Sequence, residues 1–202
     1  MAARAQSRPG RARPDGTAGH GRWRAPRRAS DRSNRARRLQ LRRVFRAFQR
    51  KHAATAFTGE GARLFGGRWN SPGKSVVYAS SSLALALLEI MANARRRIPP
   101  GLVFCTVDIP DGVTVDTLDV SRLPPRWYES PAPPALQAAG DAWIDGAISV
   151  ALVVPSAIAR IEENVLLNPA HRDFARLLVG EAQDVPVDDR LREARSRRAP
   201  KQ

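Results

Sequence analysis

Hydrophobic residues fall into short blocks between residues 41 and 191, and the pattern of each block predicts a secondary-structure element. Blocks that are rich in β-branched and aromatic residues and end at Gly, Pro or polar residues are typical of strands. The predicted strands are 44–48, 76–79, 102–109, 113–118, 149–154 and 161–167. We expect ordered structure to begin near Leu41.

Longer apolar blocks predict helices. Three serines, residues 80–82, are candidate N-caps for a helix that runs through about Arg96 and ends in a cationic turn. A second helix is predicted over 135–144, before Gly146, and a short one around Phe174. Residues 49–67 hold few core candidates and are predicted to be a long loop. Because strands and helices are mixed without regular alternation, we expect an α+β fold in a single compact domain.

The two ends of the chain differ from this patterned region in charge. The net charge of the 202 residues is +15, but residues 1–43 carry fourteen arginines against two aspartates. The segment 44–189 alone has a small net negative charge. Residues 1–38 have almost no large apolar side chain, so they cannot offset their ordering entropy and are predicted to be disordered. The sequence thus divides into an Arg-rich leader (1–40), a domain (41–191) and a basic tail (192–202).

The composition argues against several classes of protein. A single cysteine, Cys105, allows no internal disulfide, and the three histidines are dispersed, so a zinc site of ordinary ligand spacing is not expected. The apolar runs are too short to cross a bilayer, and the N-terminal end has no apolar signal region. We therefore expect a cytoplasmic protein with no metal and no membrane partner.

A glycine-rich turn, GGRWNSPG at residues 66–73, is the richest candidate for chemistry. A guanidinium held in such a turn, here that of Arg68, is suited to two-pronged binding of a phosphate or carboxylate. The alternative is an ordinary β-turn with a surface arginine and a half-buried Trp69. The spacing alone leaves both interpretations open.

Three further features are candidates. Glu89 is the only acid in its apolar helix, so its carboxylate either points into a cleft or lies on the solvent-exposed face of an amphipathic helix. Ser156 follows a strand and a proline, which suits the rim of a sheet, but it could equally cap the next turn. Residues 124–134 contain five prolines with Trp127 and Tyr128, and predict an irregular loop that could cover a cleft.

Taken in order, these motifs resemble a known family, the RES domain, which is named for its arginine, glutamate and serine. The matching segments are GEGARLFGGRWNSPG at 59–73, VYAS at 77–80, ALLE at 86–89, GDAW at 140–143, VPSA at 154–157 and NVLLNPAH at 164–171. The resemblance covers about 41–191. Two departures, Val165 where an aromatic is common and Arg172 where a proline is common, do not touch the chemistry below.

The resemblance implies a fold similar to that of ADP-ribosyltransferases, with a mixed, mainly antiparallel sheet and flanking helices. RES proteins are the toxin halves of bacterial toxin–antitoxin pairs, neutralised by an Xre-type DNA-binding antitoxin. Their known activities are NAD degradation, including phosphorolysis, and ADP-ribosyl transfer to protein. The positions carried over by the resemblance are Arg46, Arg68, Tyr78, Glu89, Ser156 and Asn164.

These residue types fit cleavage of the nicotinamide–ribose bond of NAD, which passes through an oxocarbenium-like state. Cations would hold the pyrophosphate, an aromatic ring would stack on a base, and a carboxylate would stabilise the developing positive charge. We expect catalytic roles for Glu89, Arg68 and Ser156, and substrate-binding roles for Arg46, Tyr78, Trp69 and Asn164. NAD would be the substrate and no cofactor is needed. Inorganic phosphate is the favoured acceptor, with water or a protein side chain as alternatives.

A competing hypothesis is a nucleic-acid-binding protein that acts through its basic ends, and truncation separates the two. We expect a chain without residues 1–40 and 192–202 to keep NAD-cleaving activity, because the candidate residues all lie between those ends. Nucleic-acid binding by the ends would instead be lost, and in the full chain it would weaken steeply as salt is raised. Nicotinamide release and nucleic-acid binding, measured on both chains, check this; loss of all activity on truncation would contradict the enzyme hypothesis.

Overall fold

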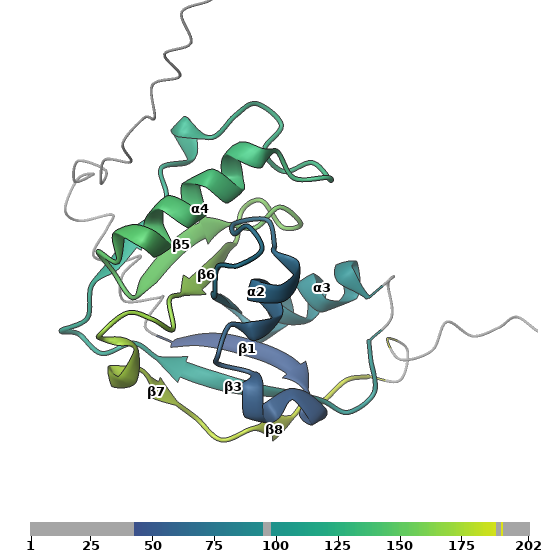
Figure 1. Ribbon diagram of the computed structural model, residues 1–202. Helices are drawn as coiled ribbons and strands as arrows, with labels where there is room; N and C mark the ends of the chain where they lie inside the picture. Colours follow the sequence, from purple (N-terminus) through teal and green to yellow (C-terminus); the bar gives the residue numbers. More distant parts are fainter. Residues whose placement is uncertain (1–42, 95–97, 189–190, 192–202) are drawn as a thin grey trace, which may run out of the picture.

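An eight-stranded, mostly antiparallel sheet forms the centre of the protein in the computed structural model, which describes residues 43–94, 98–188 and 191 (Figure 1). The strand order is β4-β5-β6-β2-β1-β3-β7, and β8 also pairs with β3. The strands are β1 Arg43–Gln49, β2 Val77–Ser80, β3 Leu102–Asp108, β4 Val115–Thr117, β5 Ala151–Pro155, β6 Glu163–Leu167, β7 Leu178–Val179 and β8 Gln183–Asp184. The predicted leader and basic tail lie outside the described residues.

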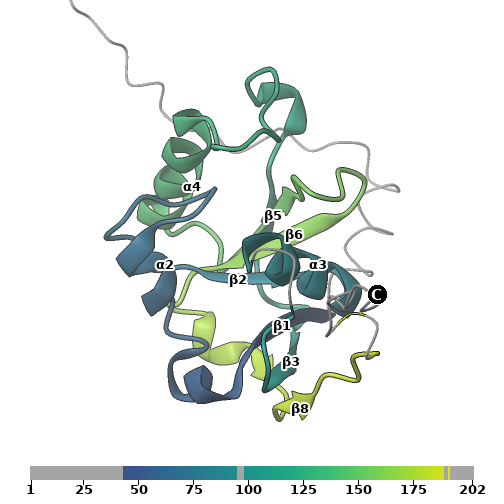
Figure 2. The same cartoon turned by 90° about the vertical axis from the view of Figure 1, so that its right-hand side faces the viewer.

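Helices and short 3-10 turns flank this sheet (Figures 1 and 2). The helices are α2 Glu60–Phe65, α3 Leu83–Asn93 and α4 Pro134–Gly146, and the 3-10 turns are η1 Arg50–Thr55, η2 Val120–Arg122 and η3 Phe174–Arg176. Helix α3 packs against β1 and β2, whereas α4 runs along β5. The predicted α+β class is confirmed. None of the described helices is long and apolar enough to cross a membrane.

Buried residues form a core on each side of the sheet. One core cluster combines the inward-facing residues of β1, β2, β3, β5 and β6, including Val44, Val77 and Val107. Another joins α4 to β5 and β6 through Leu136, Trp143 and their neighbours. The alternation of buried positions along β3 from Val103 to Asp108 follows the two-residue period of a strand with two different faces, and the two buried residues of β1, Val44 and Phe48, share one face.

Strands β1 and β2 are paired at a single register position, Phe45 with Ser80. By contrast, β1 pairs with β3 along its whole length, and β2 pairs with β6 along its whole length. The sheet is therefore continuous on both sides of this junction and loosely joined at it. This weak junction is where the candidate site described below lies.

The predicted loop at 49–67 is wrong, because this segment contains η1 and α2. Neither helix buries a residue, so no apolar period of 3.6 residues marks them in the sequence. The two-residue strands β7 and β8 were also not predicted. The helix predicted through Arg96 ends at Asn93, and residues 95–97 lie outside the described residues. Ser82 is its N-cap and accepts a 3.1 Å hydrogen bond from the amide of Leu85.

Helix α4 lies directly against the glycine-rich turn at Gly140. A Cβ atom at this position would be 1.7 Å from the carbonyl oxygen of Trp69, closer than any real contact. Since a backbone oxygen cannot move aside as a side chain can, the residue that faces the turn must be glycine. This close approach fixes the distance between α4 and the turn.

We predict that Gly140→Ala destabilises the protein by about 1–3 kcal/mol through overpacking, although alanine is the better helix former. The matched control is Gly61→Ala in α2, where an added Cβ meets nothing within 4 Å. That variant should be as stable as the unmodified protein or slightly more stable. Chemical denaturation of both variants checks this, and equal stability of the two would show that the contact between α4 and the turn yields easily.

Candidate active site

A cavity of about 180 Å³ opens at the junction of β1 and β2, beside α3. Its lining combines ionisable, amide and aromatic side chains: Phe45, Arg46, Ala47, Tyr78, Ser80, Ala86, Glu89, Ile90, Asn93 and Asn164. Four of the seven predicted site residues are in this lining: Arg46, Tyr78, Glu89 and Asn164. The structure therefore brings together residues from β1, β2, α3 and β6.

Glu89 is the centre of a hydrogen-bond network in this cavity. Its Oε1 accepts a bond of 2.9 Å from the hydroxyl of Ser156 and one of 2.6 Å from Nδ2 of Asn164. The Oδ1 of Asn164 accepts a bond of 2.7 Å from the hydroxyl of Ser80. One carboxylate oxygen is thus fixed by two donors from different strands, and the cleft interpretation of Glu89 is the one that the structure supports.

Helix α3 places this carboxylate by its own geometry. The buried residues of the helix are Leu85 and Ala86, which lie four and three positions before Glu89. Residues at that spacing share a helix face, so the face that packs on the sheet also carries the glutamate. The apolar run and its single acid therefore belong to one surface of the helix.

Ser156 combines both roles that the sequence left open. It follows β5, is fully buried and donates to Glu89. Its oxygen also accepts bonds of 3.1 Å from the amides of Ile158 and Ala159, which caps the turn after the strand. The cap holds the hydroxyl in place, and the hydroxyl in turn holds the carboxylate.

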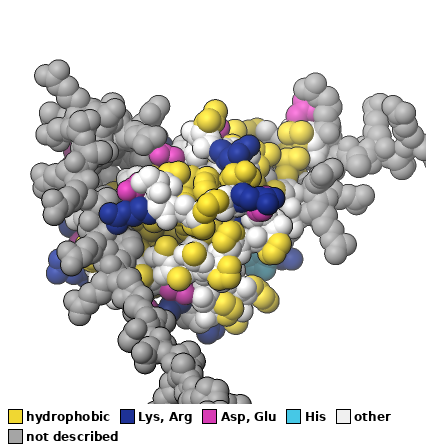
Figure 3. Space-filling view, turned by 90° about the horizontal axis from the view of Figure 1, so that it is seen from above, with side chains coloured by type: hydrophobic (Ala, Val, Ile, Leu, Met, Phe, Trp, Pro, Cys, Tyr) yellow, Lys and Arg dark blue, Asp and Glu magenta, His cyan; other side chains and the backbone are white. Residues whose placement is uncertain are grey.

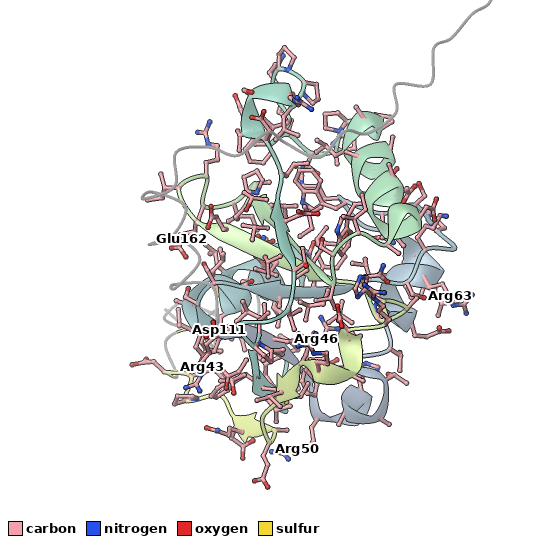
Figure 4. All side chains as sticks on the ribbon, turned by 90° about the vertical axis from the view of Figure 1, so that its left-hand side faces the viewer. Arg43, Arg46, Arg50, Arg63, Asp111 and Glu162 are labelled. Atoms are coloured by element: carbon pink, nitrogen blue, oxygen red, sulfur yellow. The ribbon has the colours of Figure 1, made fainter. Side chains whose placement is uncertain are left out.

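Arg46 extends from β1 into the space where β1 and β2 are no longer paired. Its Nε donates to the carbonyl of Ala56 at 2.5 Å, and its Nη1 donates to the carbonyl of Tyr78 at 2.6 Å. Burial lowers the pKa of Arg46 to about 10, so the side chain stays charged at neutral pH. In Figure 4 it lies in the interior, whereas Arg43, Arg50 and Arg63 lie at the periphery, where each pairs with a carboxylate.

Arg68 is outside the cavity lining but electrostatically coupled to it. Its guanidinium donates to the carbonyl oxygens of Trp127 at 2.8 Å and Glu129 at 3.1 Å. Burial lowers the pKa of Arg68, and the charge of Glu89 acts in the opposite direction. The arginine therefore lies within the electrostatic range of the carboxylate and is anchored to the proline-rich segment 124–134.

That segment is also held on its other side. The guanidinium of Arg160, in the turn that follows Ser156, lies 4.3 Å from the centre of the Tyr128 ring. Such a cation–π contact at a partly exposed site contributes about 0.5–1 kcal/mol. The segment thus bridges the glycine-rich turn and the turn that carries Ser156.

The two predicted aromatic residues have different positions. Trp69 is only 2% exposed and packs with Leu136 and Trp143 in the core, so the prediction that its ring stacks on a substrate does not hold. The core takes this large apolar ring because the turn packs directly onto α4. Tyr78 does line the cavity, but its hydroxyl is engaged with Asn70 and with the amide of Trp69. Burial raises the pKa of Tyr78 far above its usual value.

Sequence reasoning missed the other six residues of the cavity lining, and two of these, Phe45 and Ser80, bear on its chemistry. Phe45 offers a second aromatic surface, and it was predicted only as part of a strand. Ser80 was considered as a helix cap, yet it belongs to β2 and orients Asn164. The period of the strand could have found it, since Ser80 and Tyr78 are two residues apart and so share a face.

The donor set of the site does not suggest a metal. No group of three or more His, Cys, Asp and Glu side chains close enough to hold an ion occurs among residues 43–94 and 98–188. Glu89 is the one carboxylate of the cavity lining, and amide and hydroxyl donors already hold it. The arrangement suits an organic substrate with anionic groups.

The site of this α+β domain combines a carboxylate held by serine and asparagine with two arginines that are anchored by backbone carbonyls. This arrangement suits an enzyme that acts on a nucleotide. The family model for the RES domain matches residues 41–188, and the chain belongs to this family. The family resemblance that the sequence motifs indicated is thus confirmed.

Individual relatives agree with this assignment. The chain is similar to Toxin Res of Photorhabdus laumondii, with 33% identity over 75% of this chain and 98% of the relative. It is also similar to the Prs ADP-ribosylating toxin of a Sphingobium strain, with 35% identity over 61% of this chain and 79% of the relative. A similar fold occurs in the crystal structure of the M. tuberculosis MbcT–MbcA toxin–antitoxin complex, with a TM-score of 0.59, 21% identity and coverage of 71% of this chain and 83% of that one.

The hydrogen-bond network around Glu89 predicts that one substitution, Asn164→Asp, makes the stability of the protein depend on pH. In Asn164→Asp, a second carboxylate would replace the donor that now lies 2.6 Å from Glu89. Two carboxylates at that distance cannot both ionise, so the folded state would retain a proton that the unfolded state loses. The variant should therefore be close to the unmodified protein in stability near pH 4 and become progressively less stable as the pH rises to neutrality.

Thermal denaturation between acid and neutral pH measures this difference. Gln183→Glu, on the exposed strand β8, adds the same charge away from the site and should show little pH-dependent loss. A constant difference between Asn164→Asp and the unmodified protein at every pH would mean that the two side chains are not in contact.

Proposed function

We propose that this protein is the toxin of a toxin–antitoxin pair and degrades NAD by cleaving the nicotinamide–ribose bond. The observation that carries this proposal is the Glu89 carboxylate, held by Ser156 and Asn164 at the wall of a cavity that is also lined by a partly buried arginine, Arg46. The family and the names of the relatives support the toxin role.

The geometry of Glu89 suits the reacting carbon of NAD. Both donors bind Oε1, which leaves Oε2 as an acceptor for a ribose hydroxyl. A carboxylate close to the ribose stabilises the positive charge that develops as the bond to nicotinamide breaks. The electron pair of that bond leaves with nicotinamide, which is a neutral leaving group. Glu89 therefore acts in the transition state more than in binding.

Arg46 and Arg68 supply positive charge that is not ion-paired with any acidic side chain in the described part of the chain. Among the described residues, no carboxylate forms an ion pair with either arginine, and the hydrogen bonds of both go to backbone carbonyls. Carbonyl acceptors fix a guanidinium without cancelling its charge, so that charge is available to the pyrophosphate of NAD. The rings of Phe45 and Tyr78 give apolar surface for a base or for nicotinamide.

Inorganic phosphate is the acceptor that this charge favours. A phosphate oxygen would form the new bond to the ribose carbon as the bond to nicotinamide breaks, and the products would be nicotinamide and ADP-ribose 1″-phosphate. Water in place of phosphate would give ADP-ribose. The excess positive charge at the site favours the anionic acceptor over the neutral one.

A protein acceptor is the second candidate. The Sphingobium relative is named an ADP-ribosylating toxin, and transfer of ADP-ribose from NAD breaks the same nicotinamide–ribose bond. The fold is also found in a toxin–antitoxin complex, so we propose that an antitoxin, of the Xre type that the resemblance implies, is the partner of this chain. We further propose that the protein acts in the cytoplasm.

Nucleic-acid binding by the folded domain is less favoured. On the face in Figure 3, the Lys and Arg side chains form separate groups among hydrophobic and acidic ones. A nucleic-acid-binding surface usually collects its basic residues into one patch or stripe. A role for the basic ends in such binding stays a prediction.

We predict that Glu89→Gln lowers kcat for NAD cleavage by about 100-fold or more with little change in NAD binding, because the lost charge acts mainly on the transition state. Mass spectrometry of NAD incubations, with and without inorganic phosphate, identifies the products, and calorimetry measures binding. Glu60→Gln is the matched control, since Glu60 is exposed and pairs only with Arg63.

The product pattern separates the acceptors. Phosphate-dependent release of nicotinamide with ADP-ribose 1″-phosphate would support phosphorolysis, and release indifferent to phosphate would support hydrolysis. Cleavage only when a target protein is added would support transfer. Intact NAD under all three conditions, or full activity of Glu89→Gln, would overturn the proposal.

A further inference from the structure

Asn70, in the glycine-rich turn, is completely buried and makes more side-chain hydrogen bonds than a turn requires. Its Nδ2 lies 2.9 Å from the carbonyl oxygen of Ala62, 3.1 Å from that of Ser71 and 3.0 Å from that of Lys74. Ala62 is in α2, Ser71 is within the turn and Lys74 directly follows it. One carboxamide thus ties the helix before the turn to the chain that leaves it.

The other end of the same carboxamide is hydrogen-bonded to Tyr78, a residue of the cavity lining. Oδ1 of Asn70 accepts a bond of 2.8 Å from the hydroxyl of Tyr78, and that hydroxyl accepts one of 3.1 Å from the amide of Trp69. Tyr78 is part of the cavity lining, and its carbonyl anchors Arg46. The turn that carries Arg68 and the strand that anchors Arg46 are therefore linked through one buried amide.

The space around this link excludes other side chains. A Cβ atom on Gly67 would lie 2.5 Å from the Tyr78 hydroxyl and 2.9 Å from Oδ1 of Asn70. Helix α4 holds the outside of the turn through Gln137, which donates to the carbonyl of Gly67 at 3.0 Å, and Asp141, which accepts from the amide of Ser71 at 2.9 Å. The turn is clamped from both sides and cannot shift alone.

We propose that Asn70 is a positioning residue, which sets Tyr78 and the two arginines relative to Glu89 through its contact with the Tyr78 hydroxyl. This inference rests on the proposed NAD cleavage at Glu89. Asn70 itself does not line the cavity, so it acts on the substrate only through these neighbours.

The test compares two buried asparagines. Asn70→Ala should lower kcat by about 10- to 100-fold, since a misplacement of about 1 Å in the groups around a reacting centre costs that much. The matched control is Asn168→Ala. Asn168 is 1% exposed and also binds the backbone, donating to Ile144 at 3.2 Å and accepting from the amide of Ala170 at 3.0 Å, but it has no contact with the cavity lining.

Both variants lose buried hydrogen bonds, so both should be less stable, and only the Asn70 variant should lose catalytic rate beyond the folded fraction. KM for NAD should change much less than kcat. Equal effects of the two variants on kcat, at matched folded fraction, would reduce Asn70 to a purely structural residue and overturn the proposal.

Tyr78→Phe tests the same link even if Asn70→Ala does not fold, because it removes only the hydroxyl and keeps the ring at the cavity. We expect it to lower kcat, and in the double variant with Asn70→Ala the losses should not add, since both remove one connection. Unchanged kcat in Tyr78→Phe would overturn the proposal.

Hydrogen exchange separates this inference from the proposed function. In Tyr78→Phe the amide of Trp69 loses its acceptor, the Tyr78 hydroxyl, and in Asn70→Ala that hydroxyl loses the side chain that holds it. In both variants the Trp69 amide should exchange about tenfold faster or more, whereas Asn168→Ala should leave its exchange rate unchanged. Faster exchange with no NAD cleavage by the unmodified protein would show the linkage but refute the NAD activity. Unchanged exchange would refute the linkage itself.

Discussion

The hydrogen bonds to one partly buried carboxylate, that of Glu89, hold helix α3 to two distant parts of the sheet. Glu89 is the only charged residue of α3, and a polar group in that position without hydrogen-bond partners would be costly. Ser156 and Asn164 provide the donors, and they come from the end of β5 and the start of β6. Because the partners are 67 and 75 residues away in the chain, the carboxylate is satisfied only when the helix and these two strands are assembled.

The same junction shows how the sheet makes room for a ligand. Two adjacent strands that paired along their whole length would leave no space between them, but β1 and β2 meet at one position, Phe45 with Ser80. Arg46 reaches across the opening and satisfies the carbonyl of Tyr78. The Tyr78 carbonyl therefore keeps a hydrogen-bond partner although the strands are not paired there. The guanidinium of Arg46, which could bind an anionic ligand, also links the two strands.

The sequence predicted those parts of the fold that have a strong local pattern. The strands with β-branched runs and the helix capped by Ser82 were correctly predicted, whereas α2 and η1 were not, since neither has a buried face. In the site, one acid in an apolar run left the position of Glu89 open, and only the family resemblance gave it an expected role. The position of Trp69 did not follow, because a short motif does not say which side chain of a turn faces the core. The carbonyl partners of Arg68 lie 59 and 61 residues away, and no local pattern marks them.

The anchorage of Arg68 is made entirely by main-chain oxygens, those of residues 127 and 129. Any amino acid carries such an oxygen, so this contact places no demand on the identity of the anchoring residues. It depends instead on the path of the backbone, and so on the number of residues between the two carbonyls. The anchorage itself therefore tolerates a change of side chain at either position, whereas a single insertion or deletion between them would displace the arginine.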